Sequence, residues 1–396
     1  MNELEREERR KRLYRRELQK NKFAALVFLA ILLLFCLMNL VTGDKQFSEK
    51  ENRALEQKPK FTLVGVESGR WMEHYESYVS DQFVGRNFWV SLKSRVDLIA
   101  GKRKSNGVFK GKNKYLLEDI AKPDGEQMEA NLEAMKNFQK QYSDIPMYMM
   151  LVPNAANIKS DQLPRFAVTE DQNQQFAEIK KTLGTGFQWI DAEKIMKEHR
   201  SEDIYYHTDH HWTTLGAYYG YQQLAKDMKL DTSVTSNMKA YAVTNTFNGT
   251  LSSTSGYETG YEEPMYIYAP ENLDNSVQVV VNNVEAQTKT ATLYDASKLE
   301  EKDKYALFLG GNYPILDIKT TADSTDRLLL IKDSYANSVI PFLVSHYREI
   351  IVIDPRYYYD DIQEVMEDNR ISSVLFLYNG NTFVEDNSIR GVLENN

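Results

Sequence analysis

Hydrophobic residues form one long run near the N-terminus and shorter, regularly spaced runs through the rest of the chain. Residues 23–41 include no charged side chain, and Asn39 is the one strongly polar residue among them. As a helix with about 1.5 Å rise per residue, this run spans roughly 28 Å, the hydrocarbon thickness of a bilayer. The pattern predicts a single N-terminal transmembrane helix.

Charge on either side of this run indicates its orientation. Residues 1–22 contain nine Lys/Arg and five Glu, whereas the remaining chain contains 39 Lys/Arg and 52 Asp/Glu. Basic flanks stay in the cytoplasm, so we expect residues 1–22 inside and the body outside. A cleaved signal peptide is the alternative, but its apolar run is usually shorter and an A-x-A-like site is missing. We therefore expect an uncleaved anchor, a stalk at 42–65 and an extracytoplasmic domain at 66–396.

Beyond the stalk, helical periodicity alternates with short buried runs. Residues 66–100 are predicted to be helical, and apolar positions repeat at helical spacing from Met128 to Tyr142. Further helices are predicted at 170–184, 215–228, 339–347 and 360–369, and strands at 145–152, 187–190, 328–331, 350–353 and 374–378. This alternation predicts an α/β fold, with a parallel sheet between two layers of helices. Between about 230 and 310, the β-type runs 277–281 and 291–294 predict an antiparallel β-rich insertion.

Composition narrows the function classes. The chain has 42% hydrophobic and 27% charged residues, as a folded protein does, and a net charge of −9 makes nucleic acid a poor partner. Cys36 is the single cysteine and lies inside the apolar run, so a disulfide framework and a cysteine-rich metal site are excluded.

A dense polar cluster occurs at His207-Thr208-Asp209-His210-His211-Trp212-Thr213. Three of the six histidines fall within these residues. In an extended segment Asp209 and His211 share a face, and His210 points to the other. The carboxylate can then orient the His211 imidazole as in a catalytic triad, while Thr213 or Thr214 caps the next helix. A hydrogen-bonded polar loop is the alternative reading.

Two strand ends carry further candidates. The run 328–331 leads into Asp333-Ser334 and then a helical pattern, which places Ser334 at the carboxyl edge of a parallel sheet. Asn379 and Asn381 follow the run 374–378, and an asparagine amide there can donate to an oxyanion. Asp-Ser is also a common helix cap, and Asn-Gly-Asn a common turn.

Taken together, these segments resemble SGNH hydrolases, the GDSL-type esterases, whose Gly-Asp-Ser and Gly-x-Asn-Asp blocks occur in this order. Lys332 replaces the glycine, and residues 378–381 match the second block loosely. The Asp-x-His pair precedes Ser334, which resembles the AlgJ and AlgX proteins of alginate O-acetylation and the Gram-positive DHHW proteins. The chain contains that motif literally, as Asp209-His210-His211-Trp212. Supporting segments are Glu51-Asn52-Arg53-Ala54-Leu55 with Pro59, Asp81-Gln82-Phe83-x-x-Arg86 and Asn106-Gly107-Val108.

The resemblance implies an SGNH-like extracytoplasmic O-acyltransferase or esterase that acts on a cell-surface polysaccharide and needs no cofactor. Its expected partner is a multi-pass membrane O-acyltransferase that delivers the acetyl group. Carried over by motif, Ser334 is the nucleophile, His211 the base and Asp209 its orienting carboxylate. The Ser334 backbone N–H and Asn379 or Asn381 are the expected oxyanion donors.

Alternatives to this activity remain open. Trp212 and Tyr335 are candidate substrate contacts. A carbohydrate deacetylase of the same fold and a non-catalytic glycan-binding scaffold are alternative functions. The ligand types at 207–211 also allow a metallohydrolase, but adjacent histidines do not easily share one ion, so we expect no metal.

Overall fold

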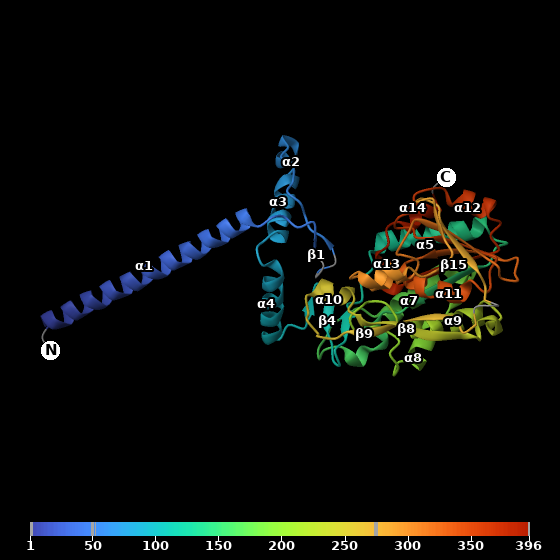
Figure 1. Cartoon of the computed structure of the whole chain (residues 1–396), viewed down its shortest axis with the longest axis horizontal. Coiled ribbons are helices and arrows are strands. Elements are labelled where there is room, and N and C mark those ends of the chain that lie inside the picture. The colour runs from blue at the N-terminus through green and yellow to red at the C-terminus, as the bar shows by residue number, and fades with distance from the viewer. Residues whose placement is uncertain (1–2, 49–50, 52, 273–275, 395–396) are drawn as a thin grey trace. The chain divides into compact units, whose positions relative to one another are not determined.

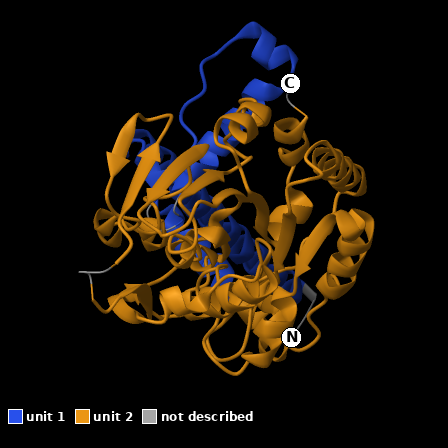
Figure 2. Cartoon of the chain, turned by 90° about the vertical axis from the view of Figure 1, so that its right-hand side faces the viewer, with its two compact units in different colours: residues 1–95 blue, residues 96–396 orange. Residues whose placement is uncertain are grey.

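The computed structural model describes residues 3–48, 51, 53–272 and 276–394. The chain divides into two compact units, Met1–Arg95 and Val96–Asn396 (Figures 1 and 2). Sequence reasoning placed the start of the body at residue 66, whereas the contacts assign residues 66–95 to the first unit. Asn52 of the first supporting segment lies outside the described residues.

The N-terminal unit begins with one continuous helix, α1 (Glu3–Val41), which joins the basic tail to the apolar run. Within the described part of the chain, Arg6–Val41 is the one helix long and apolar enough to cross a membrane. The hairpin strands β1 (Phe47–Ser48) and β2 (Arg53–Ala54) follow. The short helix α2 (Leu63–Glu67) precedes α3 (Arg70–Asp81) and α4 (Arg86–Ile99), which are separated at Gly85, a residue with φ of 69°.

An eight-stranded sheet organises the second unit, in the order β11-β10-β12-β14-β13-β15-β6-β7. Five neighbouring strands run parallel, as the alternating pattern predicted: β14 (Glu349–Ile353), β13 (Arg327–Lys332), β15 (Ser373–Asn379), β6 (Met147–Val152) and β7 (Phe187–Ile190). The other three extend it antiparallel: β12 (Ile315–Thr320), β10 (Val279–Asn283) and β11 (Thr288–Thr290).

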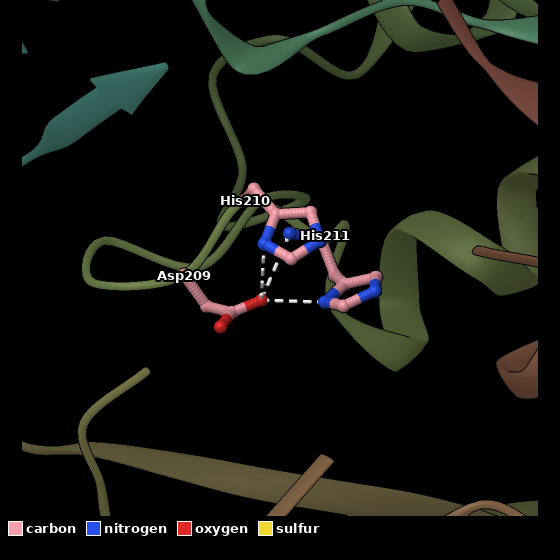
Figure 3. A group of neighbouring side chains, drawn as sticks. All are labelled: Asp209, His210 and His211. Atoms are coloured by element: carbon pink, nitrogen blue, oxygen red, sulfur yellow. Dashed lines mark hydrogen bonds and ion pairs between the residues drawn. The ribbon is translucent and has the colours of Figure 1, made fainter. Parts of the chain in front are cut away.

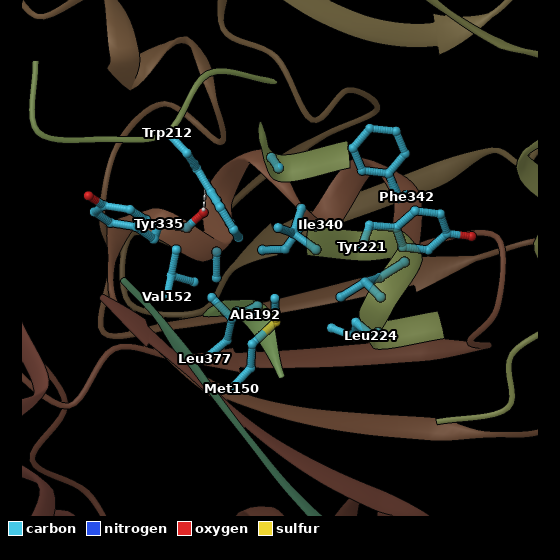
Figure 4. Close-up of a cluster of buried hydrophobic side chains, with 14 of the residues drawn as sticks. Met150, Val152, Ala192, Trp212, Tyr221, Leu224, Tyr335, Ile340, Phe342 and Leu377 are labelled. Atoms are coloured by element: carbon cyan, nitrogen blue, oxygen red, sulfur yellow. Dashed lines mark hydrogen bonds between the residues drawn. The ribbon is translucent and has the colours of Figure 1, made fainter. Parts of the chain in front are cut away.

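Alternate residues of the parallel strands enter two separate cores, because successive side chains of a strand point to opposite faces. Leu328 and Leu330 belong to one core, and Leu329 and Ile331 to the other. Helices α8 (Ala192–Glu198), α9 (Thr214–Asp227) and α11 (Ile340–Leu343) pack in the first core (Figure 4). The second contains α5 (Gly125–Gln141), α7 (Gln172–Leu183), α12 (Ile362–Asp368), α13 (Gly380–Glu385) and α14 (Ile389–Leu393). The unit is therefore a three-layer α/β/α structure.

The expected β-rich insertion consists of two structurally different parts. Strands β8 (Met238–Phe247) and β9 (Glu263–Pro270) form a separate antiparallel pair, while β10 and β11 join the edge of the main sheet. The strand expected at 291–294 is absent from the described structure there, and Tyr294 makes only an isolated bridge to Phe308. Between β8 and β9 lies the short helix α10 (Thr250–Ser255).

Two smaller features complete the second unit. Strands β3 (Lys104–Ser105), β4 (Val108–Lys110) and β5 (Leu116–Glu118) form a three-stranded antiparallel sheet. The four-residue helix α6 (Ala155–Ile158) follows β6. The helix predicted at 339–347 is reduced to α11, with a proline in its first turn, and a 3-10 helix, η6 (Ser334–Ser338), precedes it.

Candidate active site

The structure brings Asp209, His211 and Ser334 together, although the serine lies far from the other two in sequence. His211 Nε2 is 2.8 Å from Ser334 Oγ, and His211 Nδ1 is 2.6 Å from Asp209 Oδ1. Ser334 is half-buried, while Asp209 and His211 are 2% and 5% exposed. Ser334 follows β13, so the site lies at the carboxyl edge of the parallel strands, where open α/β folds place ligands.

The hydrogen bond to Asp209 determines which imidazole nitrogen of His211 carries a proton. A carboxylate is only an acceptor, so Nδ1 donates to it and Nε2 retains a lone pair for the Ser334 hydroxyl proton. Burial alone would raise the pKa of the Asp209 carboxyl, but the His210 and His211 rings and the His211 backbone N–H hold that pKa well below its usual range. Asp209 therefore stays ionised.

Helix α10 supplies the second half of the Asp209 environment. Thr250 donates to Asp209 Oδ2 from its backbone N–H at 2.8 Å and from Oγ1 at 2.9 Å. Gly249 precedes the helix, and a Cβ at this position would lie 2.3 Å from Asp209 Oδ2. A glycine is needed here because of the close approach, and not because of backbone strain, since its φ is −85°.

A buried carboxylate on β9 holds the start of the polar segment. Glu263 is 4% exposed and accepts hydrogen bonds from the backbone N–H groups of His207 and Thr208 and from Thr208 Oγ1. Thr213 Oγ1 accepts from Gly216 N and caps α9 at the other end, as predicted. The segment between is bent, so Asp209 meets His211 through a turn and not through the alternation of a strand.

The aromatic residues near Asp209, His211 and Ser334 are buried. Trp212 and Tyr335, expected as substrate contacts, are both 0% exposed, which corrects that expectation. Trp212 Nε1 donates to Tyr335 O and Ser338 Oγ, both at 3.0 Å, and the Tyr335 hydroxyl donates to His210 O. These bonds fix the His211 segment against the Ser334 segment. Tyr305 stacks on His211 with centroids 3.7 Å apart and planes 9° apart.

Comparison with known proteins places this geometry in a family. The model of the DHHW protein family matches residues 126–353, more than half of the chain, and the match includes Asp209, His211 and Ser334. The chain belongs to the DHHW family. The expected resemblance to DHHW proteins is thus confirmed. Among curated proteins, none matches this chain.

A DHHW family protein and PatB1 share this fold at low sequence identity. A DHHW family protein from Eubacterium siraeum DSM 15702 aligns with a TM-score of 0.63 and 23% identity, over 74% of this chain and 96% of that one. Bacillus cereus PatB1 with a sulfonyl adduct aligns with a TM-score of 0.58 and 22% identity, over 72% and 98%. The O-acetyltransferase domain of Pseudomonas putida AlgJ gives a TM-score of 0.45 and 13% identity, over 71% and 93%.

In this DHHW protein the two candidate oxyanion asparagines are already engaged. Asn379 Nδ2 donates to Val152 O and Asn154 Oδ1, and Asn381 Nδ2 donates to Glu118 Oε2 and Asp119 O. Both hydrogens of each amide thus have acceptors. Asn379 links the end of β15 to the end of β6, whereas Asn381, in α13, is linked to the end of β5. The Ser334 backbone N–H makes no hydrogen bond among the described residues, which keeps it available as the expected donor.

His210 lies beside the triad instead of facing away from it. Its ring centroid is 3.9 Å from that of His211, and Figure 3 shows both histidines next to Asp209. His210 Nδ1 is 2.8 Å from Thr250 Oγ1. The expectation of an outward-facing His210 is wrong because residues 207–211 are bent and not extended. Burial and the neighbouring His211 lower the pKa of His210, against the opposing effect of Asp209.

Asp209, His210 and His211 place ligand-type atoms within 4.8 Å of one another. Both nitrogens of His211 already have hydrogen-bond partners, Asp209 on one side and Ser334 on the other. The 2.6 Å contact between Asp209 and His211 is the length of a strong charge-assisted hydrogen bond. The donor set therefore fits a proton-transfer pair better than an ion site.

A polar cavity of about 660 Å³ lies next to His210. His210 and Thr250 line it together with Glu118, Lys104 and Asn381. Glu118 Oε2 accepts from the amides of Asn154 and Asn381. Burial raises the pKa of the Glu118 carboxyl, while His210 and Asn381 act in the opposite direction. Sequence reasoning missed Glu118, Thr250 and Tyr305, because no spacing relates them to the motif.

Proposed function

We propose that this chain is a membrane-anchored, SGNH-type O-acyltransferase that transfers acetyl groups to hydroxyls of a cell-surface polysaccharide. The main support is that His211 contacts both other residues, with Nδ1 2.6 Å from Asp209 Oδ1 and Nε2 2.8 Å from Ser334 Oγ. Membership of the DHHW family supports this choice of substrate, together with the motif order that resembles the proteins of alginate O-acetylation.

In the first half-reaction Ser334 Oγ attacks the carbonyl carbon of an acetyl donor while His211 Nε2 takes the hydroxyl proton. The tetrahedral oxyanion receives a hydrogen bond from the Ser334 backbone N–H. The bond to the leaving group then breaks, and His211 returns the proton to that group. The product is acetyl-Ser334, and Asp209 stabilises the transient imidazolium throughout.

In the second half-reaction a sugar hydroxyl attacks acetyl-Ser334, and His211 takes its proton and returns it to Ser334 Oγ. The polar cavity at His210 and Glu118 is the proposed acceptor site, since its volume of about 660 Å³ suits a sugar unit. Water in place of the sugar would make the same site an esterase.

The proposed topology follows from the charge pattern and from α1. Residues 1–22 form a cytoplasmic tail, 23–41 span the membrane, 42–65 form a stalk, and the rest is extracytoplasmic. A multi-pass membrane O-acyltransferase is the proposed acetyl donor, because a body outside the membrane has no direct access to cytoplasmic acyl carriers.

Covalent capture of Ser334 tests the proposal. The full-length protein in detergent is incubated with an activated acetyl ester, and the peptide containing Ser334 is examined for the mass of one added acetyl group. An oligosaccharide acceptor should then divert product from acetate to acetyl-sugar. PatB1 was solved with a sulfonyl adduct, so a sulfonyl fluoride is a second probe for Ser334.

Ser345→Ala is the matched control, because Ser345 lines a different cavity. Ser334→Ala should lose labelling by both probes, and Ser345→Ala should keep it. If no reagent labels Ser334, and Ser334→Ala leaves glycan acetylation in cells unchanged, the glycan-binding scaffold becomes the better function. Acetate without acetyl-sugar under all acceptors would identify the esterase.

A further inference from the structure

Large apolar side chains remain exposed on the helices that follow α1. Six of them, from α2, α3 and α4, are between 39% and 73% exposed: Leu63, Met72, Val79, Phe88, Trp89 and Leu92. We call this set the juxtamembrane apolar surface. A soluble surface rarely concentrates so many exposed apolar side chains in so short a segment, which indicates a partner.

The end of α1 contacts the turn between α3 and α4. Phe35 lies 5.9 Å from Phe83 and 5.8 Å from Trp89 between ring centroids. One helical turn later, Asn39 Oδ1 accepts a hydrogen bond from the Val84 backbone N–H at 2.7 Å. The single strongly polar residue of the apolar run thus satisfies a backbone donor of the α3–α4 turn.

These contacts fix the depth of the turn relative to the apolar run. Phe35 precedes the end of α1 at Val41 by six residues, or roughly 9 Å at about 1.5 Å per residue. If residues 23–41 span the bilayer, Phe83 and Trp89 lie roughly 9 Å below the level of Val41. This is within the depth of about 5–10 Å that the apolar face of an interfacial helix reaches at the boundary between acyl chains and headgroups. Tryptophan and tyrosine prefer that boundary, and two of the four tryptophans, Trp71 and Trp89, occur in this segment.

The charge distribution agrees with a lipid surface as the partner. Residues 43–95 contain nine Lys/Arg and eight Asp/Glu, whereas residues 96–396 contain 30 Lys/Arg and 44 Asp/Glu. An acidic segment would be repelled by anionic headgroups, and this nearly neutral segment is not. It is the part of the extracytoplasmic chain best suited to rest on a membrane.

We propose that the juxtamembrane apolar surface lies in the outer headgroup region of the bilayer, as an interfacial element attached to the spanning helix. The inference rests on the membrane anchor of the proposed function but not on its chemistry. The occupant is lipid, because the surface is continuous with the span through Phe35 and Asn39.

The test uses full-length protein with Cys36→Ser in nanodiscs of phosphatidylcholine and phosphatidylglycerol. A polarity-sensitive fluorophore is attached through Phe88→Cys, or through Phe166→Cys as control, since Phe166 is exposed to 83% in the second unit. We expect blue-shifted emission at residue 88 and several-fold stronger quenching there by headgroup-labelled lipids. Residue 166 should show neither effect.

Retention of the protein in the nanodisc is measured in parallel. A retained protein with a water-exposed label at residue 88 overturns this proposal and leaves the anchor intact. A label that is shielded but not quenched by lipid, with cross-linking between copies, also overturns it in favour of self-association. Failure to stay in the nanodisc would instead refute the membrane anchor of the proposed function.

Discussion

Each unit contains a buried aspartate that accepts several hydrogen bonds, but the donors differ between the two. In the N-terminal unit Asp81 accepts from Arg53 Nη2 at 2.5 Å, from Arg53 Nη1 at 2.8 Å and from the Glu56 backbone N–H at 2.8 Å. Arg86 Nε lies 3.0 Å from Glu51. In the second unit Asp209 is paired with an imidazole that also contacts a hydroxyl.

Both carboxyl groups have lowered pKa values, so the shift does not distinguish the clusters. The hydrogen bond from Arg53 is the main cause of the lowered pKa of Asp81, whereas burial acts in the opposite direction. Burial opposes the shift at Asp209 as well, and the two histidines overcome it. The difference lies in the partner: a guanidinium keeps its proton, whereas an imidazole can exchange one with Ser334. Only the second cluster can carry a reaction.

The largest expected effect is at Asp209. Asp209→Asn should leave the fold intact and reduce kcat by roughly 10²- to 10⁴-fold, because the amide no longer holds the proton on His211 Nδ1. An acetyl-transfer assay measures kcat, and circular dichroism checks that the fold is intact. Asp81→Asn is the matched carboxylate control and should keep kcat while lowering thermal stability. Equal losses of kcat in both variants would contradict the distinction drawn between the clusters.

Gly249→Ala tests whether the position of the Asp209 carboxylate matters, without changing the carboxylate itself. The added Cβ would lie 2.3 Å from Asp209 Oδ2 and must displace the carboxylate, so we expect kcat to fall by about 10²-fold. Gly391→Ala is a suitable control, since its Cβ meets nothing within 4 Å. Unchanged kcat in Gly249→Ala would show that Asp209 tolerates movement.

His210 should have a smaller effect than His211. His210→Ala removes a ring that lines the cavity and bonds Thr250, so we expect about a tenfold loss, mainly as a raised KM for the acceptor. His210→Asn, whose amide can still donate to Thr250, should recover part of it. Separate measurements of kcat and of KM for the acceptor show which of the two the substitution changes. A loss as large as that of His211→Ala with unchanged melting would favour a shared ion.

The smallest effect concerns pH and stability. The lowered pKa of His210 means that the unfolded chain binds its proton first, so stability falls as pH drops below about 6.5. The pKa of Asp209 is also lowered in the folded protein, so this group contributes stability above about pH 3.9 that is lost at more acidic pH. Wild-type Tm should therefore fall by about a few degrees between pH 7 and pH 5, and His210→Gln should abolish this fall. If Tm depends on pH in the same way in His210→Gln and in the wild type, the fall in stability between pH 7 and pH 5 is not due to His210.

Local signals in the sequence predicted the parallel strands and the three residues Asp209, His211 and Ser334, which the structure brings together. The runs 187–190, 328–331 and 350–353 agree with β7, β13 and β14 within two residues. Ser334 and the Asp209–His211 pair follow motif positions. The partners that complete the site come from the β-rich insertion: Thr250, Glu263 and Tyr305 carry no motif. Their role depends on how α10, β9 and the segment before β12 return to the sheet edge, which no local pattern encodes.

Errors arose where a local rule was applied to a residue that tertiary contacts control. Trp212 and Tyr335 look like sugar-stacking aromatics next to a motif, yet their polar atoms bond to the backbone of the facing segment and their rings enter the core. Strand alternation predicted that Asp209 meets His211, but the bend at residues 207–211 produces that contact and also brings His210 alongside.

The double hydrogen bond at Thr250 has a consequence for the tautomer of His210. The Thr250 hydroxyl has one hydrogen and gives it to the ionised Asp209, so it can only accept from His210 Nδ1. Neutral His210 is therefore the Nδ1–H tautomer, whereas its ring in a free peptide samples both. The first proton taken up on acidification must go to Nε2, and ¹⁵N chemical shifts of the imidazole would show one nitrogen titrating while the other stays protonated.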